Sequence, residues 1–191
     1  NMRRAIKIAE SLAPCILWID ELEKGFAGMS GGVSDSGTTA RVFSTFLTWM
    51  QEKTQPVFLI ATGNNVSQLP PELLRTGRFD EVFFVDLPDS KERATIFEIH
   101  LSKRKRQPSK FRVKELAKLT AGFSGAEIEQ VVIGALNHAF FEGRELSCKD
   151  LKEEAEKQVP LSRMMSEEIA NLREWSKLRA RPSANRDDDE E

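Results

Sequence analysis

Residues 15–21, CILWIDE, give the first indication of the fold of this chain. They form a continuous apolar run of strand length that ends abruptly in two acidic residues, Asp20 and Glu21. An apolar run without alternation is typical of a central strand in a parallel sheet, buried on both faces. Residues 57–61, VFLIA, repeat this pattern and lead into the polar segment 62–65, TGNN. We therefore expect two buried strands, each followed directly by polar residues.

A third apolar run, VFFV at residues 82–85, indicates another strand. Before and between these runs, apolar residues recur at helical spacing in residues 2–13 and 38–55. Strands that alternate with helices predict an α/β fold with a parallel sheet and right-handed crossovers. We expect three strands of that sheet in this chain.

Beyond Pro88 the pattern becomes wholly helical. The helical segments are residues 90–106, 113–120, 124–142 and 147–158, and the third of them keeps one face apolar throughout. A last helix is expected over residues 166–179, followed by an acidic tail, residues 187–191, that is expected to be disordered. We therefore divide the chain into an α/β part, a small helical part and a C-terminal helix with its tail, at residues 1–88, 89–160 and 161–191.

The composition argues against several classes of protein. The formal net charge of −2 gives no electrostatic reason to expect a specific nucleic-acid partner. The two cysteines, Cys15 and Cys148, match no zinc or disulfide spacing, which favours a reducing compartment. The chain contains no apolar stretch of the roughly 18 residues that would indicate a membrane span, and no signal-type apolar core follows its start.

The polar residues at the strand ends are the candidates for chemistry, because ligands of parallel α/β sheets bind beyond the carboxyl ends of the strands. A nucleotide hydrolase needs adjacent carboxylates such as Asp20 and Glu21 for two tasks. One carboxylate holds Mg²⁺, and the other accepts a proton from the attacking water. The alternative is that this pair only caps the following turn.

Four motifs in one order resemble those of AAA+ ATPases. Residues 14–24, PCILWIDELEK, resemble the Walker B segment, and residues 60–65, IATGNN, resemble sensor 1. Residues 69–80, LPPELLRTGRFD, resemble the arginine-finger region, and residues 123–128, FSGAEI, resemble the start of the lid helix. The chain is thus similar to the end of the P-loop NTPase sheet followed by an all-helical AAA+ lid.

Within AAA+ proteins, three further segments are most similar to the cyanobacterial and chloroplast-encoded family of hypothetical open-reading-frame AAA ATPases. They are residues 40–53, ARVFSTFLTWMQEK, residues 83–88, FFVDLP, and residues 172–182, LREWSKLRARP. This resemblance favours the cytoplasm of a bacterium or the stroma of a plastid.

The resemblance implies roles for single residues. Asp20 would hold Mg²⁺, Glu21 would act as the general base, and Asn64 would orient the attacking water or the γ-phosphate of ATP. Asn65 is the alternative to Asn64 in a shifted register.

The resemblance also implies an assembly. Arg75 and Arg78 would reach into the nucleotide site of a neighbouring subunit, where a guanidinium group matches the charge that develops in phosphoryl transfer. A homo-oligomeric ring, usually a hexamer in this family, is therefore implied. Gly125 and Ala126 would pack near the adenine or ribose, and residues 25–37 would occupy the second pore-loop region.

The sequence departs from the family at the phosphate-binding loop, at Gly63 and at the lid motif. No segment resembles the phosphate-binding loop, G-x-x-x-x-G-K-[ST], so we expect this fragment alone to be inactive. The chain also opens inside a helical pattern without a cap, which suggests that the native protein extends upstream. Gly63 stands where relatives often carry another small residue, and the lid motif provides no arginine near Ala126.

Two hypotheses of different classes remain. The first is an ATPase whose intact form binds and hydrolyses ATP with Mg²⁺ and remodels a partner protein. The second is a regulatory or scaffold subunit that keeps the AAA+ shape without catalysis.

Overall fold

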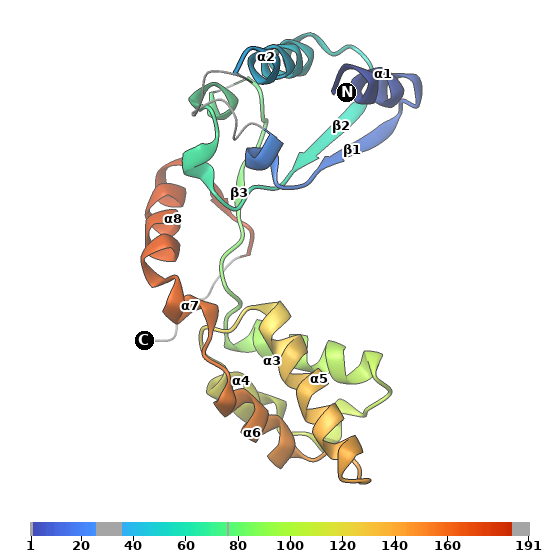
Figure 1. Ribbon diagram of the computed structural model, residues 1–191, viewed down its shortest axis with the longest axis vertical. Coiled ribbons are helices and arrows are strands. Elements are labelled where there is room, and N and C mark those ends of the chain that lie inside the picture. The colour runs from blue at the N-terminus through green and yellow to red at the C-terminus, as the bar shows by residue number, and fades with distance from the viewer. Residues whose placement is uncertain (1, 26–35, 76, 185–191) are drawn as a thin grey trace. The chain divides into compact units, whose positions relative to one another are not determined.

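The computed structural model describes residues 2–25, 36–75 and 77–184 and divides into two compact units, Asn1–Val82 and Phe83–Glu191 (Figure 1). The greater part of the second pore-loop region and the whole acidic tail lie outside the described residues. The limits of the three parts predicted from the sequence, residues 1–88, 89–160 and 161–191, stay predictions.

The first unit is built on two parallel strands. Its elements are α1 (Met2–Ser11), β1 (Cys15–Ile19), η1 (Leu22–Gly25), α2 (Ser36–Glu52), β2 (Val57–Ala61), η3 (Val66–Gln68) and η4 (Pro71–Leu74). β1 and β2 pair from Cys15 opposite Val57 to Ile19 opposite Ala61. Because α2 carries the chain back between them, the two strands run in the same direction. The two apolar runs are confirmed as strands.

One face of this sheet packs against α1 and α2 (Figure 1). The core there combines side chains from both helices and from the strands with two residues of the later turns: Ile6, Ala9, Leu22, Phe43, Phe46, Trp49, Met50, Val57 and Leu73. The other face is open: Ile16, Trp18 and Phe58 are 67%, 59% and 65% exposed. The expectation of strands buried on both faces was therefore wrong for the described residues, because both helices that pack on β1 and β2 lie on one side.

The third expected strand is β3 (Phe83–Phe84), and it pairs in parallel with β4 (Arg181–Pro182). The three predicted strands thus exist, but the described strands form two separate two-stranded sheets. The mixed α/β class with small parallel sheets is confirmed. The partner of β3 comes from the far end of the chain, where no sequence pattern indicated a strand.

The second unit is otherwise helical. Its elements are α3 (Ser90–Lys103), η5 (Pro108–Lys110), α4 (Val113–Leu119), α5 (Gly125–Phe141), α6 (Cys148–Lys157), α7 (Leu161–Met164) and α8 (Ser166–Arg179). The first four α-helices of this unit, α3 to α6, enclose one apolar core, to which α5 contributes Ile128, Val131, Val132, Ala135 and Ala139. The predicted apolar face of this helix is confirmed.

Capping boxes set the start of three of these helices. They pair Asp89 with Glu92 in α3, Ser124 with Glu127 in α5, and Ser147 with Asp150 in α6. Each pair satisfies two backbone N–H groups that the first turn of a helix leaves free, and losing a cap typically costs about 1 kcal/mol.

Asp150 has a second role as the buried end of an ion pair. Its side chain is 1% exposed, and its two oxygens accept hydrogen bonds from Nη1 and Nη2 of Arg144 at 2.7 and 2.6 Å. The Ser147 amide and hydroxyl donate to the same carboxylate at 2.8 and 2.6 Å. The bonds from Arg144, and then those from Ser147, hold the pKa of Asp150 well below its ordinary value.

We predict that Asp150→Asn destabilises the chain by roughly 2 kcal/mol near neutral pH, because the Arg144 guanidinium and the Ser147 backbone amide lose a charged acceptor that is itself buried. A carboxyl whose pKa is depressed in the folded state contributes stability above its unfolded-state pKa of about 4, and the contribution fades as pH falls toward the folded-state value. Urea unfolding at several pH values measures this difference. It should shrink below about pH 4.

The matched control is Glu153→Gln in the same helix, at a side chain that is 42% exposed. This control should change stability by less than about 0.5 kcal/mol. A difference between wild type and Asp150→Asn that stayed constant with pH would contradict the assignment of the stabilisation to the ionised carboxylate.

Candidate active site

The acidic residues after β1 and the polar residues after β2 meet at one edge of the sheet. Ile19 and Ala61 are the last paired residues of the two strands. The ladder continues one step further, because the Thr62 amide donates to the Ile19 carbonyl at 2.9 Å. The Leu22 amide then donates to the Thr62 carbonyl at 2.8 Å. The register therefore brings together the segments that the sequence predicted to carry chemistry.

Thr62 links the two acidic residues. Its hydroxyl donates to Oδ1 of Asp20 at 2.5 Å and accepts from the Glu21 amide at 3.1 Å. The hydroxyl thus orients the Asp20 carboxylate and fixes the backbone of Glu21. No role of Thr62 was predicted from the sequence, although Thr62 and Asp20 lie opposite each other, one residue beyond the paired ends of the two strands.

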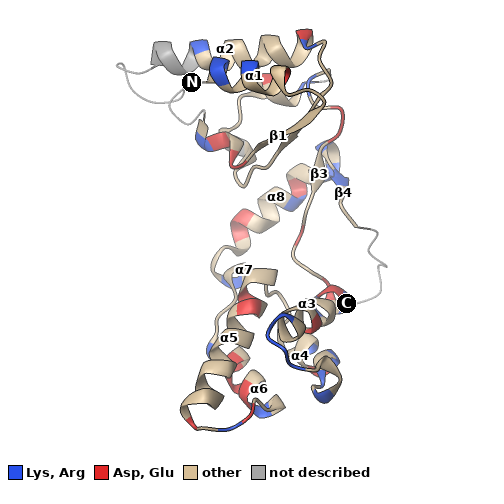
Figure 2. Cartoon of the chain, turned by 90° about the vertical axis from the view of Figure 1, so that its right-hand side faces the viewer, with Lys and Arg blue, Asp and Glu red and all other residues tan. Residues whose placement is uncertain are grey.

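Glu21 stands at a sharp change of chain direction. Its φ is +50°, a left-handed backbone conformation that disfavours residues other than glycine and is often found at functional sites. The side chain is 38% exposed, and Oε1 accepts from Nζ of Lys24 at 2.6 Å. This hydrogen bond from Lys24 to Glu21 raises the pKa of the lysine. Figure 2 shows acidic and basic residues close together in this segment after β1.

Asn64 and Asn65 follow Thr62 on the exposed rim of the first unit. The backbone amide of Asn64 donates to Oε1 of the buried Glu23 at 3.1 Å. The predicted sensor residue lies two residues after Thr62, whose hydroxyl orients the Asp20 carboxylate. Both asparagines are exposed, so Asn65 stays the alternative to Asn64.

Arg75 and Arg78 follow the turn η4 of the first unit. The turn η4 is anchored by Leu73, which is fully buried in the core of that unit. Arg75 follows η4 directly and is exposed, whereas the half-buried Arg78 donates through Nη1 to the Glu72 carbonyl. The contacts found among the described residues join neither arginine to Asp20, Glu21 or Asn64. The exposed position of Arg75 suits a group that acts on another molecule.

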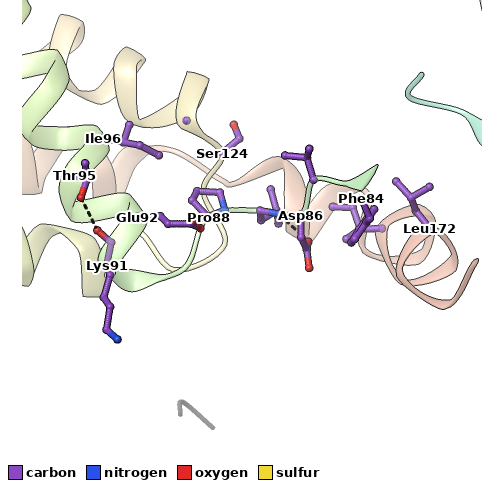
Figure 3. Close-up of a pocket in the computed structure, with 13 residues that line it drawn as sticks. Phe84, Asp86, Pro88, Lys91, Glu92, Thr95, Ile96, Ser124 and Leu172 are labelled. Atoms are coloured by element: carbon purple, nitrogen blue, oxygen red, sulfur yellow. Dashed lines mark hydrogen bonds between the residues drawn. The ribbon is translucent and has the colours of Figure 1, made fainter. Parts of the chain in front are cut away.

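Gly125 belongs to the second unit and lines a pocket of about 700 Å³ (Figure 3). The walls come from the segment 84–88, the first half of α3, the start of α5 and α8. Ser124 lies beside Gly125 in this wall, whereas Ala126 is exposed and does not line the pocket. The predicted contact of both residues with adenine or ribose stays a prediction, and only Gly125 borders this cavity.

The residues after β1 and β2 fit a magnesium nucleotide. Mg²⁺ in proteins is usually bound by one or two carboxylates together with water and substrate phosphates. Asp20 offers an exposed carboxylate whose orientation Thr62 fixes. In the described ranges we find no cluster of three or more histidine, cysteine or acidic side chains that would form an all-protein metal cage. None of the helices in these ranges combines the length and apolarity of a membrane span.

Two protein families match the chain. The ATPase family associated with various cellular activities (AAA) matches residues 1–87, and the AAA+ lid domain matches residues 110–153. A Pyropia yezoensis protein, the AAA domain-containing protein ycf46, is 51% identical over 177 residues, which are 92% of this chain and 36% of that protein. The ycf46 protein of Guillardia theta is 49% identical over 92% of this chain and 35% of its own length.

A more distant relative is the cell division cycle protein 48 homolog of Archaeoglobus fulgidus. It is 38% identical over 133 residues, which are 69% of this chain and 18% of that protein. The chain spans about a third of the length of the ycf46 proteins that it matches.

We predict that Glu21→Gly unfolds at a higher urea concentration than Glu21→Ala. The backbone at this position is left-handed, where glycine is favoured over alanine by about 1 kcal/mol. Both substitutions remove the same carboxylate and the same contact with Lys24, so their difference isolates the backbone. Equal stability of the two variants would show that the left-handed conformation is not held in solution.

Proposed function

Because the chain belongs to the AAA family of ATPases and carries part of the AAA domain followed by the lid, we propose that the intact protein binds and hydrolyses ATP. The observation that carries this proposal is the pairing of Asp20 and Glu21 with Thr62 at the edge of β1 and β2. Thr62 contacts the carboxylate of Asp20 but only the backbone of Glu21, whose carboxylate contacts Lys24 instead. The two adjacent carboxylates thus have different surroundings, as two different chemical tasks require.

The tasks follow from these surroundings. Asp20, oriented by the hydroxyl of Thr62, would hold Mg²⁺, which when bound neutralises charge on the phosphate oxygens. Glu21 accepts the proton of the attacking water. Its contact with Lys24 joins two exposed side chains, and such a pair is weak enough to yield to water. Asn64 orients this water or the terminal phosphate.

The arginines support an assembly of several copies. Arg75 is exposed and forms no ion pair with the residues that the structure describes, so its charge is free to act on a ligand held by another subunit. We infer that Arg75 completes the nucleotide site of the neighbouring subunit, together with Arg78 three residues further along the chain. Hydrolysis would then need a homo-oligomeric ring, for which we propose a hexamer.

The work of this ring, in our proposal, is the remodelling of a partner protein. Relatives encoded in plastid genomes and the lack of an evident membrane span in the described helices support the stroma of a plastid or the cytoplasm of a bacterium as its location. The phosphate-binding loop would come from a part of the protein outside this chain.

We predict that Glu21→Gln in the full-length protein lowers kcat for ATP hydrolysis by at least about 100-fold, since it removes the general base. The KM for ATP should change little, because the amide keeps the size of the side chain. The matched control is Glu52→Gln at an exposed position of α2, which should turn over ATP like wild type. Unchanged turnover by Glu21→Gln would favour the non-catalytic scaffold instead.

A mixing experiment tests the role of Arg75 in a neighbouring subunit. Arg75→Ala alone should lower kcat by at least about 100-fold, given the usual contribution of an arginine finger. When Arg75→Ala and Glu21→Gln subunits are mixed and allowed to reassemble, some interfaces combine an intact Glu21 with an intact Arg75 from the next subunit. ATP turnover should then exceed that of either variant alone. No gain in assembled rings would place Arg75 in its own subunit's site or outside the reaction.

A further inference from the structure

Glu23 is a buried carboxylate in an otherwise exposed charged segment. Glu21 and Lys24 on either side of it are partly or fully exposed, whereas Glu23 is 3% exposed within η1. Burying a carboxylate is costly unless hydrogen bonds compensate for the lost water. The packing of η1 by itself would be served better by an apolar side chain, so the contacts of this carboxylate need an explanation.

The two oxygens of Glu23 face the segment after β2. Oε1 accepts from the Asn64 amide at 3.1 Å. Oε2 is buried without a hydrogen-bond partner among the described residues. A Cβ atom added at Gly63 would lie 3.2 Å from Oε2, which is closer than nine in ten such contacts in proteins. The carboxylate therefore occupies the space that a side chain at position 63 would need.

This contact explains the glycine at position 63. Gly63 does not have a left-handed backbone, unlike Gly77, Gly122 and Gly143, so conformational freedom is not the reason for its presence. The reason is space, because a Cβ atom at this position would press against the buried Glu23 carboxylate. Relatives often carry another small residue where this chain has Gly63. The contact links this difference to the presence of Glu23.

We propose that Glu23 is a positioning residue for ATP hydrolysis, which holds the sensor segment, residues 62–64, in place against the segment that carries the general base. This inference rests on the function proposed above. Thr62 fixes one end of the sensor segment through its contacts with Glu21 and Leu22, and Glu23 fixes the other end through the Asn64 amide. Asn64 and Glu21 thus keep a defined relation, as two groups that act on one water molecule require.

Two variants of the full-length protein distinguish the effect of the Glu23 hydrogen bond on kcat from the effect of the side-chain volume. Glu23→Gln keeps the size of the side chain and an oxygen that accepts from Asn64, whereas Glu23→Leu keeps a similar size without an acceptor. We expect Glu23→Gln to retain kcat within about threefold and Glu23→Leu to lower it by roughly tenfold or more, with little change in the KM for ATP. Equal kcat for both variants would overturn the proposal.

Hydrogen exchange of the backbone amide of Asn64 gives a second readout that needs no nucleotide. It is measured by NMR on this chain, together with its circular dichroism as a check of folding. Exchange should be about tenfold faster in Glu23→Leu than in wild type and nearly unchanged in Glu23→Gln. If wild type failed to hydrolyse ATP, or if Glu21→Gln turned over like wild type, the proposed function would fail. Unchanged exchange in Glu23→Leu would refute the Glu23 contact itself.

Gly63 provides an independent test through a double-mutant cycle. Gly63→Ala pushes a methyl group against Oε2, so it should lower kcat on its own. On the background of Glu23→Ala that oxygen is absent, and adding Gly63→Ala should have little further effect. Such non-additivity is the sign of direct contact between two positions. Equal effects of Gly63→Ala on both backgrounds would show that the two residues act separately.

Discussion

The parallel register of β1 and β2 is the constraint on which the rest of the candidate site depends. Its last hydrogen bonds place Thr62 beside the turn that carries Asp20 and Glu21. A shift by one residue would turn every side chain of β2 to the opposite face and would remove the Thr62 hydroxyl from Asp20. The packing of Phe46 and Trp49 against one face therefore also fixes the geometry of the polar edge.

The strands and most helices were predictable because their signals are local. Continuous apolar runs marked β1 and β2, and helical spacing marked the second unit. Whether helices pack on one face of the sheet or on both was not predictable in this way. The apolar side chain of Trp18 is compatible in sequence with a buried and with an exposed position, and it is 59% exposed. The partner of β3 was hidden for a similar reason, because its two-residue ladder with β4 joins segments far apart in sequence.

The sequence pattern singled out the exposed candidate residues, whereas the residues that contact them, Thr62 and Glu23, were not predicted. Asp20 and Glu21 follow an apolar strand, which is a recognisable pattern, but their roles stay predictions. Glu23 is buried two residues after the left-handed Glu21, and no local sequence pattern distinguishes it from a solvated acid. By contrast, the spacing of Ser124 and Glu127 is a readable signal of a helix start that the sequence analysis did not use.

The open face of the sheet influences how the isolated chain behaves in solution. Ile16, Trp18 and Phe58 leave a contiguous apolar area in contact with water on adjacent strands. Two copies that meet through such areas release ordered solvent, and salts that are excluded from protein surfaces, such as sulfate, strengthen this attraction. We therefore expect protein concentration and the choice of buffer salt to influence whether the isolated chain self-associates.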